Sequence, residues 1–249
     1  MTAGLTNAVH DELRRCLFSG QLRAGAVLRL RALAGQLGTS VQPVRDAVQR
    51  LVAEGALEQG LNREIRVCCL SRESLIELYR IRVLLEGEAT AMAANRGPVD
   101  LAAAEAAVLR MAAASECSDT AAYSAANFDF HFGIYRAARS WHLMPLIESL
   151  WLRIGPMLDI GTEGRTRAEM RMFEGQDEHH GILAALARRD AETARARLVD
   201  DLMRARDWFL QHHRFAPPET TSGIRPLTAR TIPGPAGSQG AFPAWSTVR

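Results

Sequence analysis

The sequence predicts a mainly α-helical protein, in which an N-terminal winged helix-turn-helix is followed by an all-helical six-helix bundle. In the first part, short apolar faces at helical spacing are separated by glycines, and a short alternating segment follows them. From residue 72 to residue 213 the periodicity is helical throughout. A sheet is not expected there, because no stretch longer than a few residues alternates with a period of two.

Three short helices are predicted before residue 55. Apolar residues at helical spacing mark the first at residues 6–18 and the second at residues 30–37, and a glycine follows each. Ser40 stands directly before the third apolar face, residues 44–51, where an N-cap belongs. Pro43 falls in the first turn of that third helix, where its missing N–H costs little.

A small β-wing is predicted after the third helix. Residues 56–59 and the alternating residues 64–67 are expected as two strands, joined by a turn at residues 60–62. Two helices joined by a tight, glycine-containing turn and followed by a wing make a winged helix-turn-helix. Modules of this kind place their second helix in the major groove of DNA.

Six helices are predicted in the second part of the chain. The helical pattern breaks at five places, residues 97–98, 118, 140, 161–164 and 189–190. After residue 216 proline, glycine, serine and threonine dominate, which predicts a disordered tail. The predicted domains are therefore residues 1–69, residues 70–215 and a tail at residues 216–249.

The charge of the chain is unevenly distributed. All thirty basic side chains are arginine, and the formal net charge is +2. Residues 1–69 hold nine arginines against six acids, whereas residues 70–215 hold eighteen against twenty-one. A basic first domain is compatible with nucleic-acid binding without establishing it. The apolar content of 47% excludes a disordered or fibrous protein.

No apolar run approaches the roughly 20 residues that span a bilayer, and the first fifteen residues lack the apolar segment of a secretory signal. We therefore expect a cytoplasmic protein with no membrane partner. The cysteines show no paired metal-type spacing, and we expect reduced, mostly buried thiols at Cys16, Cys68, Cys69 and Cys117.

A specific signature runs through the first 55 residues, with Gly20-Gln21-Leu22-Arg23-Ala24-Gly25, Leu33-Ala34, Pro43-Val44-Arg45-Asp46-Ala47 and Leu51-Val52-Ala53-Glu54-Gly55. In these residues the chain resembles the GntR family of bacterial transcription regulators. The helical remainder resembles the FCD-type effector domain of the FadR subfamily, and its six predicted helices resemble the VanR-like branch. The usual opening of that domain is present as Arg82, Leu85 and Glu86.

Two positions depart from the family pattern. Where the family commonly has Ser-Arg-Thr-Pro, this chain has Ser40-Val41-Gln42-Pro43, so valine replaces a frequent DNA-contacting arginine. The wing reads Arg63-Glu64 where the family usually has Arg-Gly. The resemblance therefore implies DNA binding, but at an operator that differs from the usual one.

The recognition helix inserts its N-terminal residues into the major groove, which places Ser40, Val41, Gln42 and Arg45 opposite base edges. Glutamine pairs with adenine and arginine with guanine, and each good pair gives roughly 1–3 kcal/mol of discrimination. Arg45 is the first candidate, because the family match falls directly on it.

Three further arginines are candidates for phosphate or minor-groove contacts, Arg31, Arg50 and Arg63. The alternative for each of them is a solvated surface arginine.

The second candidate site lies in the helical part. Asn127 and His131 are four residues apart and project from one helical face, with Phe128 and Phe130 expected to pack elsewhere. In the subfamily, an Asp and a His at this spacing join two later histidines around a divalent metal. By this resemblance His131 and His179 match, Asn127 replaces the Asp, and Asp201 replaces the last His.

Two imidazoles, a carboxylate and an amide carbonyl can hold Zn²⁺, Ni²⁺, Mn²⁺ or Fe²⁺. Because asparagine brings no charge, we expect weaker binding than is usual in the family unless a carboxylate effector completes the shell. The alternative is a metal-free pocket in which both histidines are hydrogen-bonded core residues.

Arg82 and Arg153 are expected near this site. The planar guanidinium suits a carboxylate, and relatives bind small organic acids, so both are candidates for effector binding. The structural alternative is a salt bridge to Glu86, Glu148 or Asp201.

The resulting functional hypothesis is a dimeric, ligand-responsive transcription regulator, expected as a repressor, that binds a palindromic operator on double-stranded DNA and a small carboxylate effector. The competing hypothesis is a metal-dependent, hydrolase-like enzyme. It leaves the winged helix unexplained, and no nucleophile motif or phosphate loop supports it. A third alternative is a regulator whose effector domain has lost metal binding.

Overall fold

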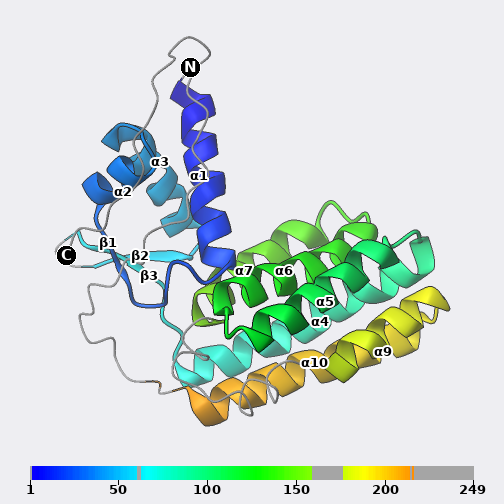
Figure 1. Cartoon of the computed structure of the whole chain (residues 1–249). Helices are drawn as coiled ribbons and strands as arrows, with labels where there is room; N and C mark the ends of the chain where they lie inside the picture. Colours follow the sequence, from blue (N-terminus) through cyan, green and yellow to red (C-terminus); the bar gives the residue numbers. More distant parts are fainter. Residues whose placement is uncertain (1, 61–62, 159–175, 214, 216–249) are drawn as a thin grey trace.

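The structure is a computed structural model that describes residues 2–60, 63–158, 176–213 and 215. Figure 1 shows a head of helices and a small sheet at one end of a helical bundle. The predicted tail at residues 216–249 and the predicted break at residues 161–164 lie outside the described residues.

The head contains α1 (Thr2–Phe18), α2 (Leu30–Gln36) and α3 (Val41–Ala53). Ser40 is the N-cap residue of α3 as predicted, with an extended backbone, although its side chain makes no capping hydrogen bond. Helix α1 begins four residues earlier than predicted, because its first turn needs no buried face and therefore leaves no apolar pattern.

A three-stranded antiparallel sheet completes the head, in the order β1 (Val27–Leu28), β3 (Ile65–Val67), β2 (Leu57–Gln59). The predicted wing is confirmed, with Leu57 opposite Val67. Strand β1 was not expected, because its two residues carry no local pattern and form a strand only by pairing with the distant β3.

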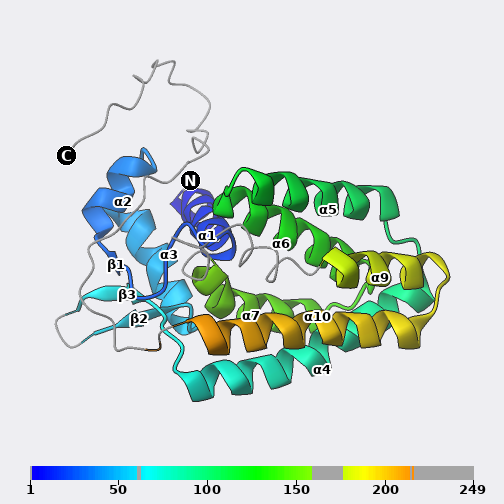
Figure 2. The same cartoon turned by 60° about the horizontal axis from the view of Figure 1, so that its bottom comes forward.

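Six described helices form the bundle: α4 (Arg72–Arg96), α5 (Leu101–Glu116), α6 (Thr120–Ala137), α7 (Leu143–Leu158), α9 (Gln176–Ala187) and α10 (Ala191–His212). Four of them begin where a side-chain oxygen accepts a hydrogen bond from the backbone N–H three residues later, at Ser71, Asp100, Asp119 and Asp190. Helices α4 and α10 lie side by side in both views, and α5 packs on α6 (Figures 1 and 2).

Helix α7 joins the head to the bundle, because it contacts α1 as well as α4. Gly155 lies so close to α1 that a Cβ there would stand 2.4 Å from the carbonyl oxygen of Leu17. Arg14 of α1 donates to Glu54 of the head at 2.9 Å and to Glu148 of α7 at 2.7 Å. The head therefore docks through backbone contact and a shared ion-pair network.

All four cysteines are free thiols, but the expectation of mostly buried thiols is wrong for two of them. Cys16 and Cys68 are buried, whereas Cys69 and Cys117 are exposed. Burial raises the pKa of the Cys16 and Cys68 thiols to about 12, so these two remain protonated and unreactive near neutral pH.

Candidate functional site

The N-terminal turns of α3 form an exposed polar face of the head. The side chains of Ser40, Gln42 and Arg45 are exposed there, while Val44 is fully buried. The amide of Gln42 donates to Asp46 at 2.8 Å. Because the side chain of Arg45 is exposed on the surface of α3, its guanidinium can reach a partner outside the chain.

The three arginines predicted to contact phosphate or the minor groove are also exposed and lie on separate elements. Arg31 is in α2, Arg50 is late in α3, and Arg63 is in the wing turn with a positive φ of 58°. Arg50 donates to the side chain of Asn7 at 2.7 Å. The three exposed arginines therefore lie on α2, on the last turn of α3 and in the wing turn.

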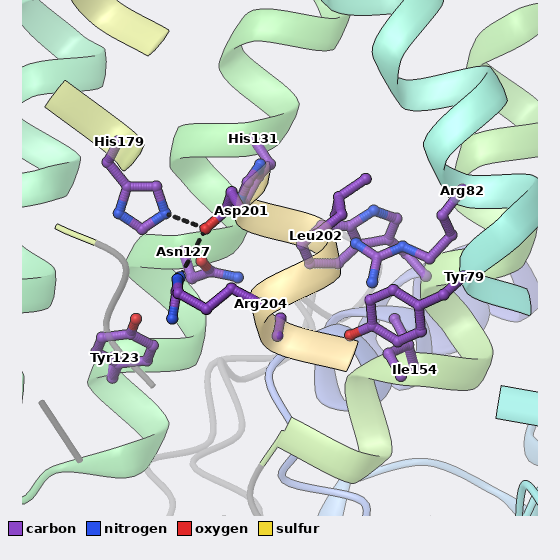
Figure 3. Close-up of a pocket in the computed structure, with 12 residues that line it drawn as sticks. Tyr79, Arg82, Tyr123, Asn127, His131, Ile154, His179, Asp201, Leu202 and Arg204 are labelled. Carbon is purple, nitrogen blue, oxygen red and sulfur yellow. Dashed lines mark hydrogen bonds and ion pairs between the residues drawn. The ribbon is translucent and has the colours of Figure 1, made fainter. Parts of the chain in front are cut away.

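The second candidate site is a buried pocket in the bundle, lined by Asn127 and His131 from α6, His179 from α9 and Asp201 from α10 (Figure 3). Its cavity volume is about 30 Å³. That is roughly the volume of one water molecule in the liquid. The pocket as it stands therefore has room for an ion or a water molecule, but not for an organic molecule of several atoms.

Three residues of the pocket, two histidines and an aspartate, have the geometry of a metal-ligand set. His131, His179 and Asp201 each offer one ligand atom, and these atoms lie within 4.8 Å of one another. Asp201 Oδ2 is 3.5 Å from His131 Nε2, and Asp201 Oδ1 is 3.5 Å from His179 Nε2. Two ligands held about 2.1 Å from an ion at a tetrahedral angle lie about 3.4 Å apart. This spacing is longer than that of good hydrogen bonds and suits a shared ion.

Burial sets the protonation state of the two histidines. It lowers the pKa of His131 to about 3 and also lowers the pKa of His179, so both imidazoles are neutral near neutral pH. Neither ring nitrogen of His179 has a hydrogen-bond partner among the described residues, which is unfavourable for a buried polar group. Neutral imidazoles with available lone pairs are the form in which histidine binds metals, so the donor set fits a divalent ion.

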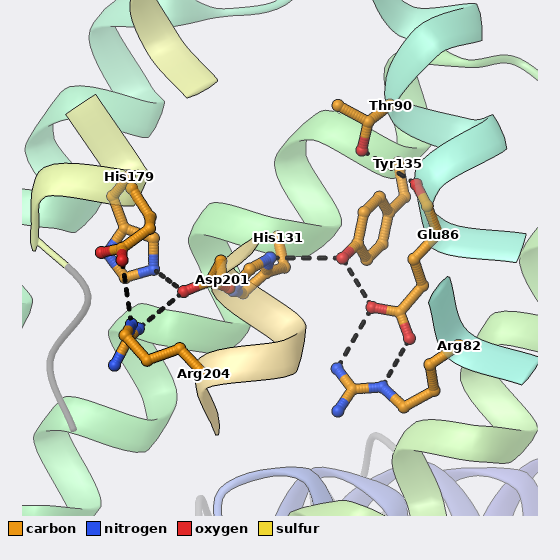
Figure 4. A network of polar contacts seen from close by, with 9 residues as sticks. Arg82, Glu86, Thr90, His131, Tyr135, His179, Asp201 and Arg204 are labelled. Carbon is orange, nitrogen blue, oxygen red and sulfur yellow. Dashed lines mark hydrogen bonds and ion pairs between the residues drawn. The ribbon is translucent and has the colours of Figure 1, made fainter. Parts of the chain in front are cut away.

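Arg204, on the turn of α10 after Asp201, places a positive charge beside the carboxylate of Asp201 in the pocket (Figure 4). It donates to Asp201 Oδ1 at 2.8 Å and lies 3.4 Å from Glu178. Burial opposes the charge on Asp201, but the neighbouring basic groups, Arg204 among them, lower the pKa of Asp201 below its usual value. Arg204 was not among the site residues predicted from the sequence, although its position three residues after Asp201 places both on one helical face.

Arg82 lines the same pocket and forms the salt bridge that the structural alternative predicted. Its guanidinium donates to Glu86 at 2.6 and 3.2 Å, and it lies between the rings of Tyr79 and Trp151. Glu86 also accepts from the hydroxyl of Tyr135 at 2.6 Å, and burial is the first cause of the raised pKa of Tyr135 (Figure 4). Arg82 is therefore neutralised within the bundle.

Arg153 does not lie where it was expected. Its guanidinium packs against Gly55 of the head, so close that a Cβ at Gly55 would stand 2.6 Å from Arg153 Nη2, and it is absent from the described lining of the pocket. Trp151, two residues earlier on α7, faces the pocket. Residues two apart on an α-helix point roughly 200° apart, so both could not face the pocket.

Phe130 also corrects an expectation, since it packs beside the site. Its ring lies 4.7 Å from the ring of His179 and 5.1 Å from that of His131, centroid to centroid. Phe128 does pack elsewhere, on Phe18 of α1 and Phe132 of α6. Phe130 therefore packs against the rings of both histidines, although it is not among the described lining residues of the pocket.

Comparison with known proteins identifies both parts of the chain. Residues 5–66 match the family described as "Bacterial regulatory proteins, gntR family", and residues 77–204 match the "FCD domain". The chain belongs to the GntR family of bacterial transcription regulators. It carries the family's DNA-binding domain and an FCD domain, the combination of the FadR-type subfamily, so it is a DNA-binding regulator and the enzyme hypothesis is set aside.

Curated relatives agree with this assignment. The chain is 36% identical over 197 residues to the HTH-type transcriptional regulator McbR of Escherichia coli, covering 79% of this chain and 88% of McbR. It is 30% identical over 190 residues to a probable D-xylose utilization operon transcriptional repressor of Paenarthrobacter nicotinovorans, covering 76% of this chain and 82% of that protein.

Solved structures share the fold. The structure of E. coli McbR/YncC superposes with a TM-score of 0.77 at 34% identity, covering 84% of this chain and 99% of that one. A GntR regulator from Rhodococcus sp. RHA1 gives a TM-score of 0.68 at 24% identity, with the same coverage. Within the described residues, no helix is both long and apolar enough to cross a membrane.

Proposed function

We propose that the protein is a homodimeric repressor whose bundle holds a divalent metal and responds to a small carboxylate. The observation that carries the metal assignment is the buried His131, His179 and Asp201 group, in which neither nitrogen of His179 has a hydrogen-bond partner among the described residues. DNA binding is assigned to residues 1–69, and effector binding and dimerisation to residues 70–215.

In this proposal Zn²⁺, Ni²⁺, Mn²⁺ or Fe²⁺ is held by His131, His179 and Asp201, with the amide oxygen of Asn127 as a fourth donor. The bound metal would supply a positive charge that attracts an effector carboxylate. The uncharged Asn127 makes that additional anionic ligand favourable.

The effector must make room for itself, because the cavity of about 30 Å³ holds little more than a water molecule. Arg204 is the pocket side chain suited to bind the effector carboxylate, because its side chain is 23% exposed whereas that of Asp201 is almost fully buried. The guanidinium of Arg204 would release Asp201 and pair with the carboxylate of the effector instead. Arg82 is a second cation of the pocket wall, already paired with Glu86. We expect Arg153, which packs on the head, to take no part.

Metal binding is expected to stabilise the folded chain. Protein purified without an affinity tag and stripped of metal should gain about 2.7 kcal/mol at an ion concentration of 100 times the dissociation constant, seen as a higher melting temperature. His131→Ala and His179→Ala should lose this gain. His180→Ala is the matched control, because His180 is adjacent to His179 but exposed. If the wild-type chain held no ion and its melting temperature did not change, the metal proposal would be wrong and the chain would be a regulator without metal.

Operator recognition is expected to depend on Arg45. Arg45→Ala should weaken binding to the specific operator by about 1–3 kcal/mol while leaving binding to unrelated DNA nearly unchanged, because a base contact carries discrimination. Fluorescence anisotropy on both DNAs measures the two terms. Arg50→Ala is the control, since loss of a phosphate contact weakens both equally and reduces the salt dependence. Equal losses on both DNAs for Arg45→Ala would overturn its role as a base reader.

The homodimer implies a palindromic operator with two half-sites. The P. nicotinovorans relative is named a repressor, which supports repression here. Light scattering of the purified chain should give the mass of two chains, and operator binding should fall when the effector is added. A monomer at micromolar concentration would overturn the dimer proposal.

A further inference from the structure

The hydroxyl of Tyr135 contacts both the candidate ligand His131 and the buried carboxylate of Glu86 (Figure 4). We propose that Glu86 and Tyr135 fix His131 in the tautomer that carries its proton on Nδ1, leaving the Nε2 lone pair directed at the metal position beside Asp201. Tyr135 and Glu86 act as positioning residues and touch no ion. The inference rests on the proposed metal site and deepens it.

The first step is the direction of the hydrogen bond between Tyr135 and Glu86. The carboxylate of Glu86 is ion-paired with Arg82, which donates to it at 2.6 and 3.2 Å, so it is an acceptor only. The distance from Tyr135 Oη to Glu86 Oε2 is 2.6 Å, a short, charge-assisted bond. The single hydroxyl hydrogen of Tyr135 therefore points to Glu86.

The second step follows from the first. Tyr135 Oη lies 3.2 Å from His131 Nδ1, and its hydrogen is already used, so it can only accept there. His131 Nδ1 must then donate, and a neutral imidazole has only one proton. Nε2 is left bare, and Nε2 is the atom 3.5 Å from Asp201 Oδ2.

Burial makes this preference strong. His131 is 2% exposed, and Glu86 and Tyr135 are fully buried, so bulk water does not compete for these bonds. The other tautomer would leave Nδ1 facing an oxygen that has no hydrogen to offer it. It would also direct the Nε2 proton at Asp201, a contact that would compete with an ion for the same two atoms. The hydrogen bond from Tyr135 to Glu86 therefore disfavours the tautomer of His131 that carries its proton on Nε2.

His179 provides an internal contrast. Neither of its ring nitrogens has a hydrogen-bond partner among the described residues. The tautomer of His131 is thus fixed before a metal binds, whereas no described hydrogen bond fixes the tautomer of His179. Loss of the Tyr135 hydroxyl should therefore change the tautomer of His131 alone.

The test is long-range ¹H–¹⁵N NMR on the full-length, metal-free chain with labelled histidine. In the wild type His131 should show a protonated Nδ1 and an unprotonated Nε2. Tyr135→Phe should shift the population toward the Nε2 proton and weaken metal binding by about 10- to 100-fold, measured by calorimetry. Glu86→Gln should act in the same direction, because the amide can donate to Tyr135 and free its hydrogen for Nδ1.

Thr90→Val is the matched control. It removes another buried hydroxyl of this network, one that donates to the backbone carbonyl of Glu86 at 2.9 Å and does not contact His131. It should leave the tautomer and the metal affinity unchanged. A wild-type Nε2 proton, or a Tyr135→Phe variant that behaves like Thr90→Val, would overturn the inference. Because the tautomer is measured without metal, an Nδ1 proton in a chain that binds no ion supports the inference and overturns the metal proposal.

Discussion

Replacing Arg82 with methionine is expected to lower the free energy of unfolding by about 3–5 kcal/mol. Arg82 is 3% exposed, and its partner Glu86 is fully buried. Methionine keeps most of the apolar stem, so the main loss is the guanidinium. Among the described side chains, that loss leaves Tyr135 as the one donor to the buried carboxylate. The contacts of Arg82 with the rings of Tyr79 and Trp151 are lost as well. Urea unfolding of the metal-free chain measures the change.

Two further variants make this prediction specific. The double variant Arg82→Met/Glu86→Leu should recover most of the lost stability, because it removes both buried charges. Arg110→Met breaks a salt bridge to Asp129 whose two side chains are more than half exposed, and it should change stability by less than about 1 kcal/mol. A loss for Arg82→Met as small as that for Arg110→Met would mean that water reaches the buried pair.

The helices were predictable from sequence because their signals are local. Apolar spacing marks the buried face of each helix, and Ser71, Asp100, Asp119 and Asp190 mark four starts through capping bonds that span only three residues. Strand β1 has no comparable signal. It depends on pairing with β3, whose sequence lies far along the chain, so no local pattern could reveal it.

The candidate metal-ligand set was predictable only through the family resemblance. His131, His179 and Asp201 come from three helices, and helical spacing says nothing about which faces of different helices meet. The position of Arg153 follows once the structure places Trp151 in the pocket, because residues two apart on one helix point in different directions. Arg204 and Tyr135 were also within reach, since each lies three or four residues from a predicted ligand and therefore on its face.

The charge partners of the pocket were only partly predictable. Glu86 lies four residues after Arg82 on one helical face, so local spacing alone favours that pair, whereas the partner of Glu148 depends on packing between elements. In the structure Glu86 pairs with Arg82, whereas Glu148 pairs with Arg14 of the head. The second of these pairs crosses between the head and the bundle, a contact that depends on how the two parts dock.

Replacing Gly155 with alanine is expected to lower the free energy of unfolding by about 3 kcal/mol, at the upper end of the range for an added methyl group in a packed interior. The new Cβ would stand 2.4 Å from the carbonyl oxygen of Leu17 and 2.9 Å from the Cα of Phe18. Both are backbone atoms at the end of α1 and cannot rotate away as a side chain could. The carbonyl oxygen of the neighbouring Pro156 accepts a hydrogen bond from the N–H of Ala24 at 3.2 Å. This bond holds α7 against the segment that follows α1.

Gly133→Ala is the matched control, because no atom lies within 4 Å of a Cβ at Gly133 in the exposed face of α6. There the same chemical change should raise stability by about 0.5–1 kcal/mol, since alanine favours a helix more than glycine does. The two substitutions are thus expected to have opposite signs in one urea-unfolding experiment. If Gly155→Ala also stabilised the chain, helix α7 would not be in backbone contact with α1. Because that contact is one of those that hold the DNA-binding head against the bundle, Gly155→Ala should also weaken operator binding, whereas Gly133→Ala should leave it unchanged.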